Sequence, residues 1–238
     1  MVPFVLIASF PAGPFQANCY LVAPGEGARC VVIDPGMEAA PGVRQALAQY
    51  RLDVAGVIAT HGHVDHVHSA ASIADEHDVP VWIHPADREM LRNPLVGVSA
   101  QMGQMLVDRY GTTDLVPPRH VRDLVDGQAV ELAGMSFGVS HAPGHTPGCA
   151  LLGLDAEEGP LTFSGDVLFA GSIGRTDLPG GSMASMVRTL RDVVLGLDDD
   201  RTILPGHGPT TTMARERATN PYLQPATLAR LVDESDVS

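Results

Sequence analysis

Four side chains that can bind a metal ion lie within one short segment. The run Thr60-His61-Gly62-His63-Val64-Asp65-His66 holds three imidazoles and one carboxylate. Where a strand turns into a loop, alternate residues face the same side, so His61 and His63 can converge on one ion. Asp65 and His66 are then directed toward a neighbouring ion. A chance histidine-rich loop would explain a single histidine, but this density of donors favours a centre for two metal ions.

Further donors follow at three later points, each at the end of an expected strand and beside a glycine. His145 lies in a loop with two prolines and two glycines, Asp166 ends the run 161–166, and His207 follows the run 203–206. The ends of strands are where α/β folds place their ligand-binding loops. The sequence therefore predicts four strand ends that each bring potential metal ligands to one site.

Hydrophobic periodicity predicts alternating strands and helices in the first half of the chain. The strand over 54–59 leads directly into the histidine cluster. The stretch 86–110 is expected to be mostly helical, interrupted around Asn93-Pro94 and Gly97, and to form either a helical lid or a packed surface hairpin. The other strands expected here cover 2–7, 18–22, 30–33 and 79–83, and the other helices cover 41–51 and 67–77.

Short strands predominate from residue 119 onward. No linker or repeat divides the sequence, so we expect one domain over 1–238, with closing C-terminal helices within 211–234. Each half gives strands followed by helices, which predicts an α/β fold with two packed sheets and helices outside, a four-layer αββα sandwich. The strands expected here cover 121–125, 129–132, 135–140, 150–154, 161–164 and 202–204, and the helices cover 183–197, 211–220 and 222–232.

The charge and composition argue against several classes of function. The formal net charge is −13, and all 15 lysine-plus-arginine residues are arginines. Such a surface repels phosphate backbones, so nucleic acid is not an expected partner, and without lysine there is no Schiff-base chemistry. No apolar run is long enough to span a membrane and the opening lacks a signal-peptide pattern, so we expect a cytoplasmic protein without membrane contact. The sequence carries no signal for an oligomeric state.

The three cysteines are expected to be buried free thiols. Cys19, Cys30 and Cys149 are odd in number and have the spacing of neither a disulfide framework nor a zinc ribbon. Two of them lie inside expected strands, where a thiol packs as a small apolar group. We therefore expect them to take no part in catalysis.

The order of the donors resembles that of the metallo-β-lactamase-fold superfamily, and the match covers nearly the whole chain. The family pattern is His-x-His-x-Asp-His, then a single His, a single Asp and a final His. The family fold is the same αββα sandwich. The resemblance implies that Asp166 bridges two ions. It also implies that metal one is held by His61, His63 and His145, and metal two by Asp65, His66 and His207.

Within this superfamily, the segments 165–169 and 171–177 resemble the glyoxalase II branch, and the chain is most similar to its short bacterial members. That branch consists of hydroxyacylglutathione hydrolases, thioesterases that cleave S-lactoylglutathione. The resemblance implies a small-molecule thioester substrate, S-lactoylglutathione or a related acyl-thiol, attacked by a metal-bridged hydroxide that Asp65 orients. Two divalent ions are expected, with zinc favoured over iron or manganese. Longer members carry a lysine and a tyrosine for the glutathione moiety, where this chain has Arg175 and Asp177. Arg175 is expected to grip a substrate carboxylate through its guanidinium fork.

Other activities remain as alternatives within the same fold. The run Gly174-Arg175-Thr176-Asp177 also resembles persulfide dioxygenases, which bind a single iron through the equivalents of His61, His145 and Asp166. A lactonase or a non-catalytic metal-binding protein is a further alternative, although the retention of all seven donors disfavours the latter. Lactam hydrolysis is disfavoured because the main zinc class of metallo-β-lactamases has a cysteine where Asp166 stands.

Overall fold

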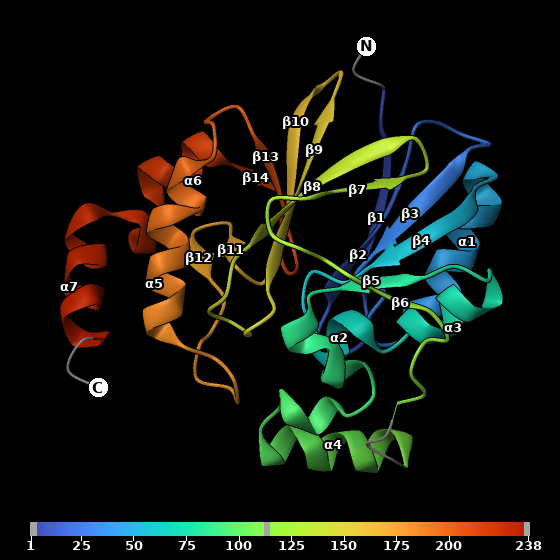
Figure 1. Ribbon diagram of the computed structural model, residues 1–238, viewed down its shortest axis with the longest axis horizontal. Helices are drawn as coiled ribbons and strands as arrows, with labels where there is room; N and C mark the ends of the chain where they lie inside the picture. The colour runs from blue at the N-terminus through green and yellow to red at the C-terminus, as the bar shows by residue number, and fades with distance from the viewer. Residues whose placement is uncertain (1–3, 112–114, 236–238) are drawn as a thin grey trace.

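Two six-stranded β-sheets face each other in the middle of the molecule (Figure 1). The computed structural model describes residues 4–111 and 115–235, with side chains described up to residue 231. The first sheet consists of β1 (Leu6–Ala12), β2 (Ala17–Ala23), β3 (Arg29–Ile33), β4 (Asp53–Ile58), β5 (Val81–Ile83) and β6 (Val121–Asp123), in that order. The second consists of β14 (Thr211–Thr212), β13 (Thr202–Pro205), β10 (Gly159–Gly165), β9 (Ala150–Ala156), β8 (Met135–His141) and β7 (Ala129–Leu132), in that order.

The central strands of the first sheet are covered on both faces. β3, β4 and β5 run parallel to one another, and parallel strands need both faces buried. In β3, Val31 and Ile33 belong to the apolar cluster between the two sheets, whereas Val32 belongs to the cluster on the helical side. The alternation of side chains along a strand thus explains why this run is apolar at every position from Cys30 to Ile33.

Helices cover the outer faces of both sheets. In Figure 1, α1 (Ala40–Tyr50) and α3 (Ala70–Glu76) lie beside the first sheet. α5 (Met183–Asp192) and α6 (Met213–Thr219) lie beside the second, and α7 (Pro225–Ser235) packs on the outside of α5. One buried apolar cluster fills each space between layers. Val43 and Ile73 belong to the first cluster, Phe163 to the one between the sheets, and Leu190 to the third. The αββα sandwich expected from the sequence is therefore confirmed.

Several helices differ in extent from the sequence-based expectation. The helix expected over 67–77 is the shorter α3, and a separate short helix, α2 (Val64–Val67), precedes it. The Ser69 amide separates the two helices because it donates to the Pro35 carbonyl. The helix expected over 183–197 ends at Asp192 and is followed by the 3₁₀ helix η3 (Val194–Gly196). In the closing segment, β14 takes the first two positions, followed by α6, η4 (Pro221–Leu223) and α7.

The stretch 86–110 is broken where the sequence indicated. It consists of the 3₁₀ helices η1 (Pro85–Leu91) and η2 (Pro94–Val96) and of α4 (Ala100–Tyr110). The break at Asn93-Pro94 has a local cause, because the Asn93 side chain accepts the Leu95 amide and starts a new turn. Met37, Val64, Val98 and Leu106 form a small apolar cluster that packs α4 against the body. That this segment moves as a lid stays a prediction.

Two features of the strands were not expected. β1 begins at Leu6 and continues to Ala12 instead of covering 2–7, and residues 2 and 3 of that prediction lie outside the described part of the chain. A short hairpin of β11 (Leu168–Phe169) and β12 (Ser172–Ile173) follows β10 and is too brief to give an alternating pattern. No helix among the described residues is long and apolar enough to cross a membrane.

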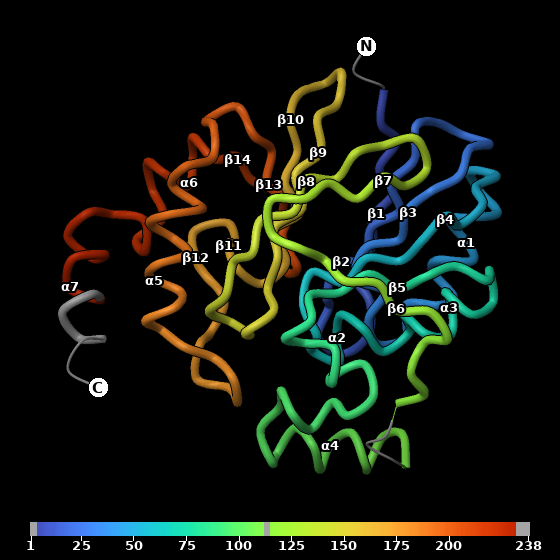
Figure 2. Tube along the Cα trace, viewed as in Figure 1, coloured from blue at the N-terminus to red at the C-terminus, as the bar shows by residue number. Residues whose placement is uncertain are grey.

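The loops that follow β4, β8, β10 and β13 bring the potential metal ligands together. The trace in Figure 2 shows that these strands lie in the two facing sheets, β4 in the first and the other three in the second. The loop after β13 also contacts the start of β2, where Ala17 forms an isolated β-bridge with His207. The site therefore lies on the line where the two sheets meet.

The burial of the cysteines predicts their reactivity. Burial raises the pKa of Cys30 to about 12 and also raises those of Cys19 and Cys149. Since the thiolate is the reactive form, we expect iodoacetamide at pH 8 to leave the native protein unlabelled and to label all three thiols in 8 M urea, as mass spectrometry would show. The folded-state pKa values exceed that of an unfolded thiol, so the free energy of unfolding should fall as the pH rises above ~8.5. Rapid labelling of a native thiol would contradict the packing.

Candidate metal centre

The end of β4 carries the first histidines into the site. β4 is buried from Val54 to Ile58, and the chain continues into Thr60 and His61. The carboxylate of Asp34 accepts hydrogen bonds from the Thr60 amide at 2.7 Å and from the Thr60 hydroxyl at 2.6 Å. This contact joins the end of β3 to the end of β4, so the backbone that presents His61 is fixed.

Three histidines form the first group of donors. One ring nitrogen from each of His61, His63 and His145 lies within 4.8 Å of the others, and the three side chains are buried. The His145 Nδ1–H donates to the Arg175 carbonyl at 2.7 Å, which leaves the Nε2 lone pair of His145 directed at the group. That Nε2 atom lies 2.7 Å from His63 Nδ1. The structure thus brings together the three residues that the sequence assigned to metal one.

A carboxylate and two histidines form the second group, Asp65, His66 and His207. The His66 Nδ1–H donates to Asp34 at 3.0 Å, and the His207 Nδ1–H donates to the Phe15 carbonyl at 3.1 Å. Both Nε2 atoms therefore face the interior of the group, 3.3 Å apart. Asp65 Oδ2 lies 3.2 Å from His207 Nε2. These are the residues that the sequence assigned to metal two.

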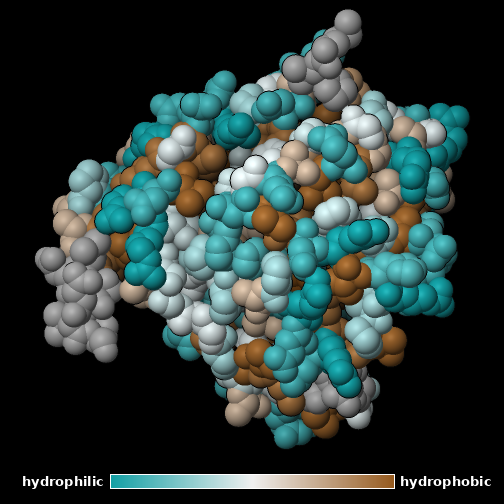
Figure 3. Space-filling model, viewed as in Figure 1, coloured by the Kyte–Doolittle hydropathy of each residue, from teal (hydrophilic) through white to brown (hydrophobic). Residues whose placement is uncertain are grey.

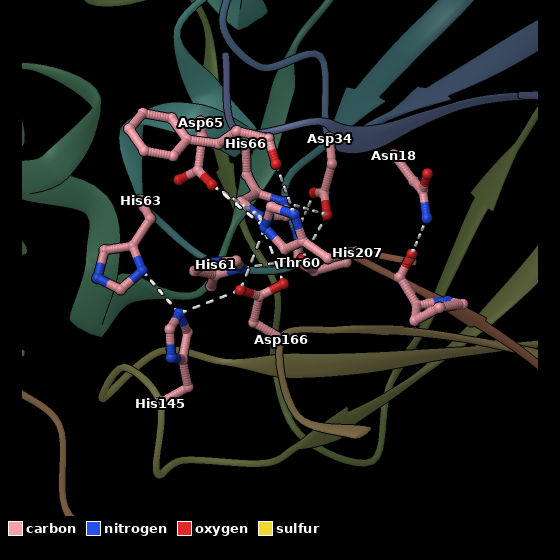
Figure 4. Close-up of polar contacts among 12 residues, drawn as sticks. Asn18, Asp34, Thr60, His61, His63, Asp65, His66, His145, Asp166 and His207 are labelled. Atoms are coloured by element: carbon pink, nitrogen blue, oxygen red, sulfur yellow. Dashed lines mark hydrogen bonds and ion pairs between the residues drawn. The ribbon is translucent and has the colours of Figure 1, made fainter. Parts of the chain in front are cut away.

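Asp166 lies between the two groups, as Figure 4 shows. Its Oδ1 is 3.4 Å from His66 Nε2, and its Oδ2 is 3.5 Å from both His145 Nε2 and His207 Nε2. One carboxylate thus contacts a member of each group. This position is the one that a bridging ligand would need.

The loop that carries His207 is attached to the first sheet. The Asn18 side-chain amide donates to the carbonyls of Pro205 and Gly208 at 3.0 and 2.9 Å, and the Asn18 backbone amide donates to Gly206 (Figure 4). Glycine is needed at position 206 because the backbone there passes close to the Asp166 carboxylate. A Cβ atom at this position would lie 2.1 Å from Asp166 Oδ1.

The buried donors fit metal ions. His61 Nε2, His63 Nε2 and Asp166 Oδ1 are buried and have no hydrogen-bond partner in the described structure. Leaving such polar atoms unsatisfied costs free energy, about 1–3 kcal/mol for each neutral group. His61 Nε2 and Asp166 Oδ1 belong to the donor groups, where coordination to a cation would satisfy them. Imidazole and carboxylate donors suit zinc, iron and manganese.

The electrostatics of the site also fit cations. Burial lowers the pKa of His61 well below its usual range and that of His63 to about 3, so both rings are neutral and keep a lone pair. Burial alone would also lower the pKa of His66, but the carboxylates of Asp166 and Asp65 raise it to about 10. Burial opposes ionisation of Asp65 as well, yet the neighbouring His66 holds the pKa of Asp65 below its usual range. The carboxylates that favour positive charge on His66 would favour a bound divalent ion at the same place.

Asp34 is a functional residue that sequence reasoning missed. With His61 and His66 it forms a third group of close donors, but its oxygens already accept three hydrogen bonds from Thr60 and His66. We therefore assign it to orienting His66 rather than to binding an ion. It follows the strand 30–33 directly, so the strand-end signal was present. The sequence Asp34-Pro35-Gly36 is also typical of an ordinary turn, so Asp34 was not distinguished from a turn residue.

Asp87 in η1 is a second missed residue. It is fully buried, and it accepts hydrogen bonds from the amides of Gly62 and Gly148 at 2.9 and 2.8 Å and from the Thr146 hydroxyl at 2.6 Å. Gly62 lies between two histidines of the first group, and Thr146 follows the third. One carboxylate thus fixes both loops that supply this group. Nothing in its sequence spacing indicated this role.

A cavity of about 390 Å³ opens over the two groups. Its floor includes His63, Asp65, His145, Asp166 and His207. Its wall is mostly apolar, and α4 and the residues before it contribute Met102 and Val98 to it. The apolar lining residues are Phe15, Val64, Val98, Met102, Phe169 and Leu178.

Arg175 lines this cavity, but its fork is occupied. The guanidinium Nε and Nη2 atoms donate to the two Asp177 oxygens, each at 2.7 Å. The backbone carbonyl of Arg175 is the group that orients His145. The structure places Arg175 in the lining of the cavity, and its binding of a substrate carboxylate stays a prediction.

Comparison with known proteins assigns the chain to a family. The model of the metallo-beta-lactamase superfamily matches residues 12–207, from the end of β1 to the last histidine of the second group. The chain belongs to the metallo-beta-lactamase superfamily. Members of this superfamily are metal-dependent hydrolases, and this member retains two groups of side chains that can hold metal ions.

Two relatives match this chain over nearly its whole length. An uncharacterized protein of Mycobacterium tuberculosis is 40% identical over 224 residues, which cover 92% of this chain and 98% of that protein. The hydroxyacylglutathione hydrolase GloC of Haemophilus influenzae is 34% identical over 217 residues, which cover 91% of this chain and 97% of that enzyme.

Two solved structures of similar sequence share the fold of this superfamily member. The BLEG-1 B3 metallo-beta-lactamase has a TM-score of 0.79 and 30% identity, and the match covers 92% of this chain and all of that chain. TTHA1623 in a di-iron-bound form has a TM-score of 0.74 and 33% identity, with the same coverage. The di-iron-bound form of TTHA1623 agrees with the two donor groups of this chain.

The close approach at Gly206 predicts the effect of one methyl group. We expect Gly206→Ala to displace Asp166 or His66, because the new Cβ would lie 2.1 Å from Asp166 Oδ1 and 2.8 Å from His66 Cε1. Metal content measured by mass spectrometry should fall from two ions toward one or none. Gly196→Ala is the matched control, since a Cβ there meets nothing within 4 Å. Equal metal content in the two variants would refute the assignment of Asp166.

The contacts of Asp87 predict a variant with weakened metal binding. In Asp87→Asn, one oxygen becomes an NH₂ group, so at least one buried amide donor loses its acceptor at a cost of about 1–3 kcal/mol. We expect a lower free energy of unfolding in urea and a metal affinity reduced by about tenfold or more, measured by chelator competition. Glu89→Gln, at an exposed position on the same helix η1, should change neither. A stability loss with unchanged metal affinity would show that Asp87 serves only the fold.

Proposed function

We propose that this protein is a thioesterase of the glyoxalase II type that hydrolyses S-lactoylglutathione or a related acyl-thiol with two divalent ions. The observation that carries the proposal is the pair of buried donor groups joined by Asp166 under one cavity. The similarity to a hydroxyacylglutathione hydrolase over 91% of the chain supports the same activity. Zinc is the proposed metal, with iron or manganese as substitutes.

The chemistry of the reaction matches what the site offers. Two bound divalent ions would supply a water of lowered pKa and would polarise the acyl carbonyl. The acyl carbon gains a bond to the water oxygen and loses its bond to sulfur, so a carboxylic acid and a thiol leave. A thiol leaving group with a pKa near ~8.5 needs no dedicated acid, and the site correspondingly relies on bases and neutral imidazoles.

The chain's own residues have distinct parts in this proposal. His61, His63 and His145 hold the first ion through their imidazole nitrogens, with His145 fixed by a backbone carbonyl. Asp65 lines the cavity beside His207, where it both binds the second ion and orients the attacking water. The apolar wall keeps bulk water from the reacting carbonyl and shapes the space for the substrate.

The partner of this site is accordingly a small molecule. The cavity of about 390 Å³ has the size of small-molecule sites. The net charge of −13 argues against nucleic acid as a partner, because a negative surface repels phosphate.

A panel of substrates on metal-defined protein tests the proposal. We expect the zinc-loaded protein to hydrolyse S-lactoyl thioesters, with the rate measured by the release of thiol. A chelator should abolish this rate, and added zinc should restore it. Asp65→Ala should lower kcat by at least about a hundredfold. Asp155→Ala, an exposed aspartate in the β9 strand, is the matched control. Undiminished activity of Asp65→Ala would refute the role of Asp65, and no hydrolysis of any thioester would refute the proposal.

The same panel separates the other activities of this fold. β-Lactam hydrolysis is the second candidate, because BLEG-1, named as a B3 metallo-beta-lactamase, is 30% identical over 92% of this chain. Turnover of nitrocefin faster than of every thioester would favour it. Hydrolysis of a lactone faster than of every thioester would likewise favour a lactonase. Sulfite formation from glutathione persulfide, with one iron for each chain, would instead identify a persulfide dioxygenase.

A further inference from the structure

A buried acidic side chain of α6 has no part in the proposed reaction. Glu216 is 0% exposed, and a buried carboxyl group is costly unless hydrogen bonds satisfy it. Its Oε1 accepts the Thr211 hydroxyl at 2.7 Å, and its Oε2 accepts the Gly171 amide at 2.7 Å and the Asn220 side-chain amide at 2.9 Å. One side chain thus joins the turn of the β11–β12 hairpin to β14, the strand that follows the loop of His207.

The hairpin contacts both the helices and the cavity. Leu168 and Ile173 belong to the apolar cluster between the second sheet and its helices. Alternation along β11 turns the next side chain, Phe169, the other way. Phe169 lines the cavity and meets the His207 ring edge-on, with the ring centroids 6.1 Å apart. The tip of the hairpin, residues 169–172, is therefore part of the cavity wall beside the second donor group.

Asn220 binds the backbone of the same tip. Its side chain is buried, and its amide donates to the Ser172 carbonyl at 3.0 Å and to the Phe169 carbonyl at 3.4 Å. With the bond from the Gly171 amide to Glu216, these contacts hold three of the four tip residues from the side of α6 and η4. The backbone that presents Phe169 thus depends on two buried side chains that line no part of the cavity.

The base of the hairpin is fixed by a different contact. A Cβ atom at Gly174 would lie 1.8 Å from the Asp166 carbonyl oxygen, so the chain after β12 packs directly against the residue between the two donor groups. Loss of the contacts at the tip would therefore release Phe169 while the metal ligands keep their places. Glu216 and Asn220 also follow residue 207, where the match to the superfamily model ends.

We propose that Glu216 and Asn220 are positioning residues for substrate binding, which act by holding the hairpin tip and its Phe169 side chain in the cavity wall. They touch neither the substrate nor the reacting atoms. Because Phe169 offers apolar surface to a bound molecule, a displaced tip should weaken substrate binding more than it slows the bond changes. This inference rests on the proposed function only for the substrate used in its test.

The variant Glu216→Met tests the positioning of the tip, with Glu216→Gln as the conservative variant. Methionine removes all three acceptor contacts, whereas glutamine can keep them because the Thr211 hydroxyl can accept as well as donate. We expect the amides of 168–173 to exchange hydrogen about tenfold faster in Glu216→Met, measured by mass spectrometry, and at the wild-type rate in Glu216→Gln. Asn220→Ala, which leaves Glu216 in place, should also speed this exchange and provides the test if Glu216→Met does not fold.

Arg217→Met is the matched control on the same helix. Arg217 also makes three hydrogen bonds, to Asp199 and to the carbonyls of Leu195 and Leu197, which lie in η3 and just after it. Both methionine variants should lower the free energy of unfolding in urea. Only Glu216→Met should speed exchange in the hairpin.

Kinetics with S-lactoylglutathione on the metal-loaded protein test the effect on binding. KM should rise at least about threefold in Glu216→Met, with kcat within about twofold of the wild type, because an apolar contact is lost from the wall. Glu216→Gln and Arg217→Met should keep the wild-type KM, and metal content should be equal in all variants. In a Phe169→Ala background, Glu216→Met should not raise KM further, since the side chain through which it acts is gone.

The outcomes separate this inference from the proposed function. Wild-type exchange of the hairpin in both Glu216→Met and Asn220→Ala would overturn the positioning role, whatever the activity. Faster exchange with an unchanged KM, or an equal rise of KM in Arg217→Met, would overturn the effect on binding. If the wild type hydrolyses no thioester, the thioesterase is refuted, and the exchange measurement still decides whether Glu216 and Asn220 hold the tip.

Discussion

Burial of several ionisable donors at the meeting line of two sheets is the constraint on which the rest of this structure depends. Buried imidazoles and carboxylates without hydrogen bonds are costly inside a protein, and His61 Nε2 and Asp166 Oδ1 have no hydrogen-bond partner in the described structure. Such a cluster persists only if its neighbours fix each side chain. Backbone carbonyls of Arg175 and Phe15 do this for His145 and His207, and Asp34 does it for His66.

The same constraint explains how the two sheets are joined. The Tyr20 hydroxyl and the Asn18 amide, both from β2, donate to the Pro205 carbonyl at the end of β13. Asp87 joins the loop after β4 to the loop after β8 by three hydrogen bonds. Polar contacts therefore cross between the sheets at the site, whereas the space between the sheets is otherwise filled by an apolar cluster. A change in the packing of the sheets would alter the geometry of the donors directly.

The chemistry of the floor and the selectivity of the wall have different origins in this fold. The donors of the floor follow strands of both sheets and belong to the pattern that the superfamily model matches. The wall comes from loops and from the segment that contains η2 and α4, including Val98, Met102 and Leu178. Loops tolerate substitution better than strands because they lie at the surface. Similar proteins can thus share one metal centre and differ in the molecule that they accept.

The sequence by itself indicated seven potential donors and the αββα sandwich, because strand periodicity and the spacing of histidines are local properties of the chain. The order of the donors also resembled the pattern of the superfamily to which the chain belongs. The division of His61 from Asp65 into separate groups also followed from local alternation. Tertiary structure alone decided the parts of Asp34 and Asp87, since their partners are 25 to 61 residues away in the sequence. It also decided that the fork of Arg175 is occupied by Asp177. A charge pair two residues apart forms only when the loop conformation permits it, and packing against the rest of the molecule determines that conformation.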